Sequence, residues 1–417
     1  MKRTVVLALL VSAAVAGSVL AWYSARQQRE YRRLIALGDA SLAREETSVA
    51  VEAFSGAAAL QPESMLAYLK RGDTYRRRGE LSAALRDLRQ ASALDPISTR
   101  ALELLGDVNS AMGRYERATE DYRRFIAVDD RSPRVLYKLA LAHYRNGQPA
   151  AAIEPLRQAV TLDEGFSEAH HLLGACLRSR NQPNEALRSL RRAVELNPAF
   201  AAARADLADL CRETGRNREA IEQLEALAAI EPGRAERLVS VGLAYARLGR
   251  TDAAITTLGR AAERYPDEPA VYGAIARVWL QAAEQRVDRV ALGKALEALQ
   301  PASTDANVSG DTRALYGRAL FLAGDTDRAF HALQDAAAAL PVAPDTLVWL
   351  AAAADRRGDA NTARRAIADY RALVDDVAAD DLARRLTESI RLQRRLRLSG
   401  AGLSRGRARR ATRLPGS

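Results

Sequence analysis

Apolar and polar positions along this chain recur with a period of 34 residues. The frame is clearest when its repeats start at residues 31, 65, 99, 133, 167, 201 and 235. Within it, position 8 holds a small residue, position 20 holds alanine and position 24 holds a large apolar or aromatic residue. Position 32 is usually proline. Seven repeats follow one another without insertion or deletion, and this regularity indicates a repeat architecture.

Each repeat contains two amphipathic helical stretches separated by a polar turn, such as residues 181–184. Small residues at positions 8 and 20 let the two helices approach closely, and the large residue at position 24 fills the remaining space. Proline at position 32 lacks an amide hydrogen, so it ends the second helix. One repeat cannot bury its apolar face alone, so we expect neighbouring repeats to stack into an all-α solenoid.

The frame continues past residue 268 with one break. We divide the repeats into a regular block at 31–268, a degenerate repeat at 269–309 and two further repeats at 310–377. In the degenerate repeat the second helix returns seven residues late, at Ala295 and Leu299. A longer loop in a tolerant array and a hinge between two blocks both explain this insertion.

This pattern of period and positions resembles the tetratricopeptide repeat (TPR) family. The resemblance implies a right-handed α-solenoid of about ten helix-turn-helix repeats. It also implies that positions 2, 5, 9 and 12 of the first helices line a concave groove that binds a protein or peptide. The groove residues expected from this resemblance are Arg134, Tyr137, Leu141, Tyr144, His171, Arg178, Asp209 and Arg212. Tyrosine and arginine are common interface hot spots, so we expect apolar contacts at the tyrosines and charge partners at Arg178 and Arg212. The alternative is a solvated concave wall with no preferred partner.

Catalytic chemistry has little support in the sequence. It lacks a phosphate-binding glycine loop, zinc-spaced cysteine pairs and a nucleophile elbow. A metal site built from His143 with His170 or His171 is conceivable, but packed or groove-lining histidines explain these residues better. We therefore expect a non-enzymatic protein without catalytic residues, metal or cofactor.

The N-terminus predicts a membrane segment. Residues 5–22 are almost entirely apolar and follow Lys2 and Arg3. As a helix they span about 27 Å, just short of a bilayer core of about 30 Å. We favour an uncleaved anchor within residues 1–29, with a cleaved secretory signal as the alternative. Membrane-anchored bacterial TPR proteins resemble this arrangement of anchor, basic stretch and repeats. A short basic N-terminus usually stays inside while the chain that follows is translocated, so we expect a single-pass bacterial inner-membrane protein with a periplasmic solenoid. A solenoid facing the cytoplasm remains a second possibility.

The positive charge of the chain lies at its C-terminus. The net charge is +10, and nine arginines follow residue 390 without any acidic residue. Residues 378–396 predict an amphipathic helix that caps the last repeat, and 397–417 predict a disordered arginine-rich tail.

Our first hypothesis is a membrane-tethered scaffold for envelope assembly or secretion. The alternative is that the tail binds an anionic lipid, polymer or nucleic acid. The sequence leaves the oligomeric state open.

Overall fold

The computed structural model describes the backbone of residues 2–300, 308–375, 378 and 380–411. It describes the side chains of residues 15, 17–300, 308–375, 378 and 380–399. This part of the chain is all-helical and contains no β-strand. The chain divides into two compact units, Met1–Asp206 (unit 1) and Leu207–Ser417 (unit 2). The boundary lies within α11, Ala201–Glu213.

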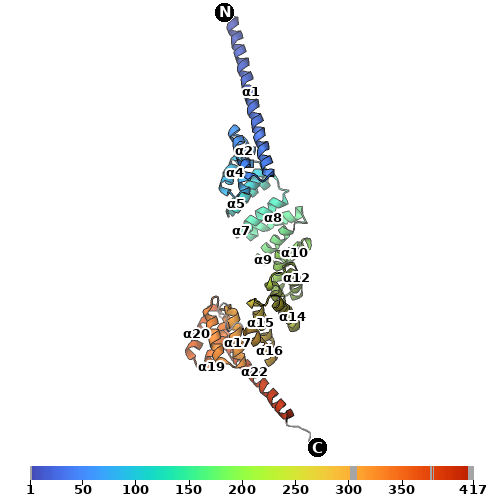
Figure 1. Ribbon diagram of the computed structural model, residues 1–417, viewed down its shortest axis with the longest axis vertical. Coiled ribbons are helices and arrows are strands. Elements are labelled where there is room, and N and C mark those ends of the chain that lie inside the picture. Colours follow the sequence, from blue (N-terminus) through green and yellow to red (C-terminus); the bar gives the residue numbers. More distant parts are fainter. Residues whose placement is uncertain (1, 301–307, 376–377, 379, 412–417) are drawn as a thin grey trace. The chain divides into compact units, whose positions relative to one another are not determined.

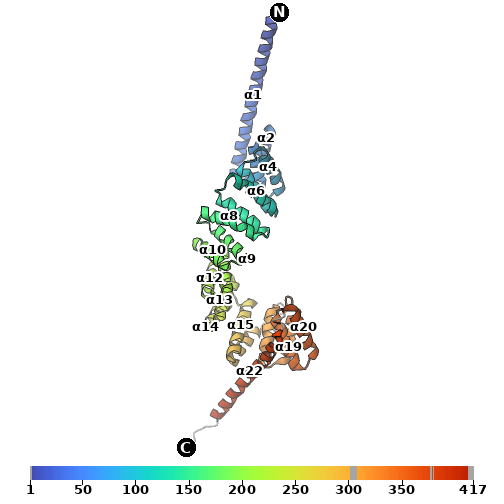
Figure 2. The same ribbon diagram turned by 180° about the vertical axis from the view of Figure 1, so that it is seen from behind.

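Unit 1 is a series of antiparallel helix pairs in which each helix packs on the next (Figures 1 and 2). Its helices before α11 are α1 (Lys2–Ala43), α2 (Thr47–Leu60), α3 (Met65–Arg77), α4 (Leu81–Leu94), α5 (Thr99–Ala111), α6 (Tyr115–Val128), α7 (Pro133–Arg145), α8 (Pro149–Leu162), α9 (Ser167–Ser179) and α10 (Pro183–Leu196). The odd-numbered helices are the first helices of successive repeats. The end of α1 supplies the first helix of the first repeat.

The positions that define the period have the packing roles expected of them. A Cβ atom added to Gly106 would lie 2.3 Å from the ring of Tyr122, so only glycine allows α5 and α6 to pack as they do. The same relation joins Gly38 to Phe54. Alanine at position 20 is fully buried, as at Ala84. The prediction that small residues at position 8 make room for the large residue at position 24 is confirmed.

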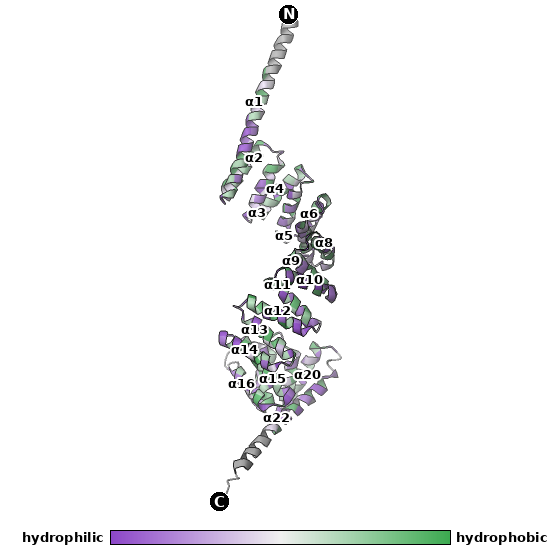
Figure 3. Cartoon of the chain, turned by 90° about the vertical axis from the view of Figure 1, so that its right-hand side faces the viewer, coloured by the Kyte–Doolittle hydropathy of each residue, from purple (hydrophilic) through white to green (hydrophobic). Residues whose placement is uncertain are grey.

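Caps and turns define where the helices begin and end. Ser98 precedes α5, and its hydroxyl accepts a hydrogen bond from the amide of Ala101, which satisfies a donor that the helix leaves unpaired. The turn between the two helices of a repeat has a left-handed residue at position 15. Gly113 holds this position with φ +71°, a conformation that glycine adopts at little cost. Hydrophilic and hydrophobic residues alternate around the helices, as amphipathic packing requires (Figure 3).

Unit 2 contains the remaining helix pairs and a long C-terminal helix. After α11 its helices are α12 (Asn217–Ile230), α13 (Ala235–Arg247), α14 (Thr251–Arg264), α15 (Pro269–Arg286), α16 (Arg289–Leu299), α17 (Gly310–Ala323), α18 (Thr326–Ala338), α19 (Pro344–Arg357), α20 (Ala360–Leu373) and α22 (Leu382–Ala411). In the degenerate repeat, α15 is 18 residues long, so α16 begins late. Residues 301–307, which include Pro301, lie outside the described part.

The C-terminal helix, α22, is longer than the expected cap. It packs on α19 of the last repeat, and it also lies across α17 and contacts α16. Its backbone remains helical to Ala411, whereas the sequence analysis placed disorder from residue 397. Residues 397–411 contain no proline, and arginine, leucine and alanine, which favour helix, outnumber the three glycines there. Residues 412–417 lie outside the described part.

The predicted membrane segment is only partly covered by the structure. Among the described residues, no helix has both the length and the apolar character needed to cross a membrane. The segment at 5–22 includes residues 5–14 and 16, whose side chains lie outside the described part.

Candidate partner-binding face

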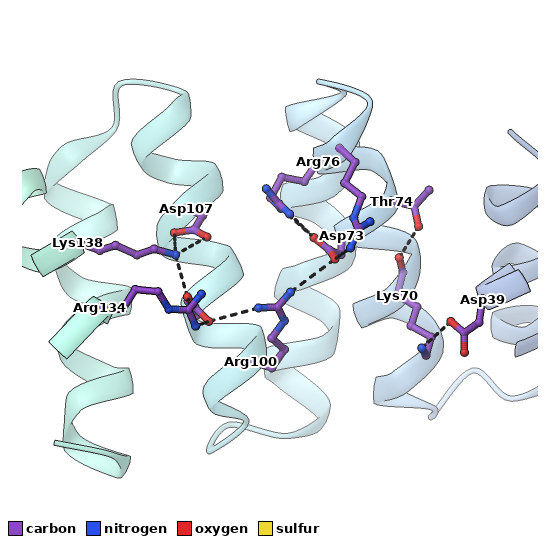
Figure 4. Close-up of polar contacts among 11 residues, drawn as sticks. Asp39, Lys70, Asp73, Thr74, Arg76, Arg100, Asp107, Arg134 and Lys138 are labelled. Carbon is purple, nitrogen blue, oxygen red and sulfur yellow. Dashed lines mark hydrogen bonds and ion pairs between the residues drawn. The ribbon is translucent and has the colours of Figure 1, made fainter. Parts of the chain in front are cut away.

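Side chains at positions 2, 5, 6, 9 and 12 of the first helices in unit 1 form what we call the inner face. At its N-terminal end, ion pairs join each first helix to the next (Figure 4). Lys70 of α3 pairs with Asp39 of α1 at 2.7 Å. Asp73 of α3 accepts Arg76 at 2.7 Å and lies 3.6 Å from Arg100 of α5. These contacts link α1, α3 and α5 through their side chains.

The network continues around a buried carboxylate on α5. Glu103 is 3% exposed, with Lys138 at 2.8 Å and Arg134 at 3.0 Å, both from α7. Lys138 also contacts Asp107 at 2.7 Å. Asp107 accepts a hydrogen bond from the hydroxyl of Tyr122 at 2.8 Å. Burial of the hydroxyl is the main reason that the pKa of Tyr122 is raised, and the negative charge of Asp107 is the second. The carboxylates at this end of the face are therefore neutralised from within the protein.

Aromatic and apolar side chains follow on α7. The ring of Tyr137 packs against Phe166, with centroids 5.1 Å apart, and its burial raises the pKa of its hydroxyl. Leu141 is half-buried, and Tyr144 is 42% exposed one turn further along α7. We call Tyr137, Leu141 and Tyr144 the aromatic step. It offers apolar area beside the charged network.

A second polar group lies beyond the aromatic step, on α9. The imidazole of His171 lies 2.7 Å from the Asp206 carboxylate and contacts the Phe200 ring edge to face at 4.9 Å. Arg178 lies 4.0 Å from the same carboxylate. The carboxylate of Asp206 thus contacts His171 and Arg178, the two predicted groove residues of α9.

The predicted groove residues fall in both units. Asp209 and Arg212 belong to unit 2, where their side chains pair at 3.2 Å. They border a cavity of about 320 Å³, whose wall also includes Ser240 and Leu243 of α13. The sequence analysis expected Arg178 and Arg212 to offer charge to a partner. In the structure each of them pairs with an acidic residue of the protein itself, and whether they also contact a partner stays a prediction.

Sequence reasoning missed the residues that neutralise the inner face. Asp39 and Lys70 are separated by 31 residues, and so are Asp107 and Lys138. The sequence therefore contained a signal for these pairs, namely an acidic residue at position 9 followed by lysine at position 6 of the next repeat. It predicts a bond between adjacent repeats instead of a site for an external ligand.

The histidines have packing and hydrogen-bonding roles. His143 is buried, lies 3.0 Å from the side-chain oxygen of Gln148 and 3.2 Å from Arg123. Its burial lowers the imidazole pKa. Across the described residues, no group of three or more potential ligands is placed to hold a metal ion.

Comparisons with known proteins give the family. Models described as tetratricopeptide repeat match residues 35–96, 69–109 and 104–165, then 177–241 and 235–278. Together these matches cover more than half of the chain. The chain belongs to the tetratricopeptide repeat family. No curated protein matches it.

Several solved structures of TPR proteins are similar to this chain. The C-terminal part of a TPR protein from Cytophaga hutchinsonii matches with a TM-score of 0.51 and 15% identity, over 59% of this chain and 99% of that one. A TPR protein from Parabacteroides merdae matches at 0.44 and 17%, over 60% and 99%. YrrB, a TPR protein with an unusual peptide-binding site, matches at 0.41 and 24%, over 45% and 97%. At these identities the likeness concerns the fold alone.

Proposed function

We propose that this TPR protein is a non-enzymatic scaffold whose inner face in unit 1 binds a peptide segment of a partner protein at the aromatic step. The TPR fold is consistent with protein–protein interaction. The observation that carries the proposal is the exposure of Tyr144 beside half-buried Leu141 and Tyr137. Large aromatic side chains supply contact area with little loss of conformational entropy, so they serve as anchors in binding sites.

The charged network favours an apolar anchor in the partner. Asp73, Glu103 and Asp107 already have basic partners within 3.6 Å. An incoming charge would have to compete with these pairs and would gain little net energy. We therefore expect the partner to contribute apolar or aromatic side chains at Leu141 and Tyr144. The phenol hydroxyls would fix its orientation.

The test compares two variants of the full chain in affinity purification. Tyr137→Ala with Tyr144→Ala removes the aromatic step, and Tyr115→Ala removes a half-buried tyrosine at the start of α6 as a matched control. We expect the first variant to lose the proteins that co-purify with the wild type, and the control to keep them. Unchanged co-purification with the first variant would reject the proposal, provided that both variants keep the wild-type melting temperature.

We further propose a tether to the bacterial inner membrane through residues 5–22, with the repeats in the periplasm, and a role in envelope assembly or secretion. The support is the apolar run after Lys2 and Arg3. Full-length protein should then remain in the membrane pellet after alkaline carbonate extraction. Release into the supernatant would exclude an anchor and leave the cleaved signal. A reporter fused near residue 374 would distinguish periplasmic from cytoplasmic repeats.

A second candidate function is binding of an anionic lipid, polymer or nucleic acid by the C-terminal arginines. Arg391, Arg394, Arg395 and Arg397 are exposed on α22, which places basic groups at the surface. Binding through charge alone should weaken steeply as salt rises. Retention of binding to anionic vesicles after deletion of residues 405–417 and substitution of these four arginines by glutamine would reject it.

A further inference from the structure

The inner face of the last two repeats is covered by the C-terminal helix of the same chain. Counted in the same frame, α22 contacts Phe321, which holds position 12 of α17. Arg318, at position 9, borders a cavity between α17 and α22. It also contacts Asp345 and Val348, which hold positions 2 and 5 of α19. These are the positions that form the inner face in unit 1. In unit 2, α22 therefore lies where a partner segment is expected.

The contacts resemble those of a ligand helix in a groove. Leu396 is 1% exposed and packs in one cluster with Phe321 and Trp349, and Leu386 and Ile390 pack against the same cluster. Ile390 follows Leu386 by four residues and Leu396 follows Ile390 by six, which places all three on one side of the helix.

Polar contacts fix the orientation of α22. Arg385 pairs with Asp345 and donates to the hydroxyl of Tyr370 at 2.8 Å. The side-chain amide of Gln393 donates to the carbonyl oxygen of Phe321 at 2.7 Å. These bonds set both the position of α22 along the face and its rotation about its own axis.

The fit between α22 and the face is incomplete. A cavity of about 420 Å³ lies between them, lined by Arg318, Trp349 and Leu392 among others. Gln393 is 1% exposed, yet among the described residues its side-chain oxygen has no hydrogen-bond partner. A buried acceptor without a partner weakens the seating of a helix, and the open cavity leaves room beside α22 for larger side chains. A ligand that fills the cavity and replaces the glutamine with an apolar residue would fit better.

We propose that the inner face of repeats nine and ten is a binding site for an amphipathic helix, and that α22 occupies it as an internal ligand that a partner helix must displace. The partner carries apolar residues at the spacing of Leu382, Leu386, Ile390 and Leu396, and a basic residue that pairs with Asp345. This site is separate from the aromatic step of unit 1, and a failure of either proposal would leave the other untouched.

The experiment measures binding of a fluorescent peptide with the sequence of residues 380–399 to the full chain by anisotropy. Leu386→Asp with Ile390→Asp in the chain should release α22 while leaving the face unchanged. Gln393→Leu should hold α22 more firmly, because the Phe321 carbonyl still accepts the Gly324 amide. An occupied site lowers apparent affinity by the fraction of open protein. We expect the release variant to bind the peptide about tenfold more tightly than wild type, and the Gln393→Leu variant to bind it more weakly.

Two controls keep the outcome specific. Arg394→Asp adds a negative charge to the exposed side of α22 and should leave peptide binding at the wild-type level. Val348→Asp, added to the release variant, should abolish binding by damaging the face itself. A peptide carrying aspartate at positions 386 and 390 should not bind any variant. Equal affinity of wild type, release variant and Gln393→Leu for the peptide would overturn the proposal.

Fluorescence of Trp349 gives a second reading that does not depend on the peptide binding. In a chain with Trp22→Phe and Trp279→Phe, Trp349 is the only tryptophan, and its buried indole packs in the same cluster as Leu396 of α22. The release variant should shift its emission to the red, and the added peptide should reverse the shift. An unshifted emission in the release variant at an unchanged melting temperature would also overturn the proposal.

Discussion

At the scale of single residues, the fold depends on contacts that exclude even one methyl group. Gly242 of α13 faces Leu258 of α14, and an added Cβ would lie 2.5 Å from the leucine Cγ. Gly259 lies one residue further along α14, with nothing within 4 Å of its would-be Cβ. Gly242 is therefore tightly packed, whereas Gly259 faces open space. Replacing each with alanine distinguishes the cost of forcing two helices apart from the gain in helix propensity.

We predict that Gly242→Ala destabilises the protein by about 1–3 kcal/mol, because the two helices must move apart. Gly259→Ala should be neutral or stabilise by up to about 1 kcal/mol, since alanine is the better helix former. Urea unfolding followed by circular dichroism measures both. Equal effects from the two substitutions would show that packing at position 8 does not limit the approach of the helices.

At the scale of helices, the period alone predicted the pairs, and the residues at positions 8, 20 and 24 predicted how they pack. The polar turn between the two helices was predicted, but the left-handed residue at position 15 was not, although glycine recurs there at Gly79, Gly113 and Gly147. The placement of α22 was not readable from its own pattern. An amphipathic helix after a repeat array can cap the stack or lie across the first helices, and only the contacts of Gln393 and Arg385 decide between these.

The candidate site was predicted in outline. Tyr137 and Tyr144 lie where the family pattern placed them, and whether they bind a partner stays a prediction. The pairing of Arg178 with Asp206 was not foreseen, because it depends on side chains of two different repeats. Periodicity places residues on a face, whereas charge compensation depends on which side chains meet across it.

A prediction at this scale concerns the ion network that joins α5 to α7. Glu103→Ala should cost about 2 kcal/mol, because it leaves Lys138 and Arg134 without their shared carboxylate. This is below the ~3–5 kcal/mol of a fully buried pair, since Arg134 is 62% exposed and partly screened by water.

The matched control for the network is Glu154→Ala, an exposed carboxylate on α8, which should change stability by less than about 0.5 kcal/mol. Denaturant unfolding of both variants gives the comparison. If Glu103→Ala were as mild as the control, the network would not contribute to the stability of the inner face.

At the scale of the whole molecule, two inner faces of one chain are in different states. In unit 1, Tyr144 of the aromatic step is exposed at the surface. In unit 2 the corresponding positions of the last repeats lie under α22. If both proposals hold, the protein has two sites of different availability, and a partner reaches the second only after α22 leaves.

Site-specific photocrosslinking tests the central claim, that the inner face of unit 1 receives a partner, most directly. A photoreactive phenylalanine replaces Tyr144 of the aromatic step in one full-length variant and Ala151, exposed on α8, in another. We predict a discrete crosslinked product in cells from position 144 and none from position 151. Crosslinking from position 151 but not from position 144 would contradict the account and move the partner to the outer helices.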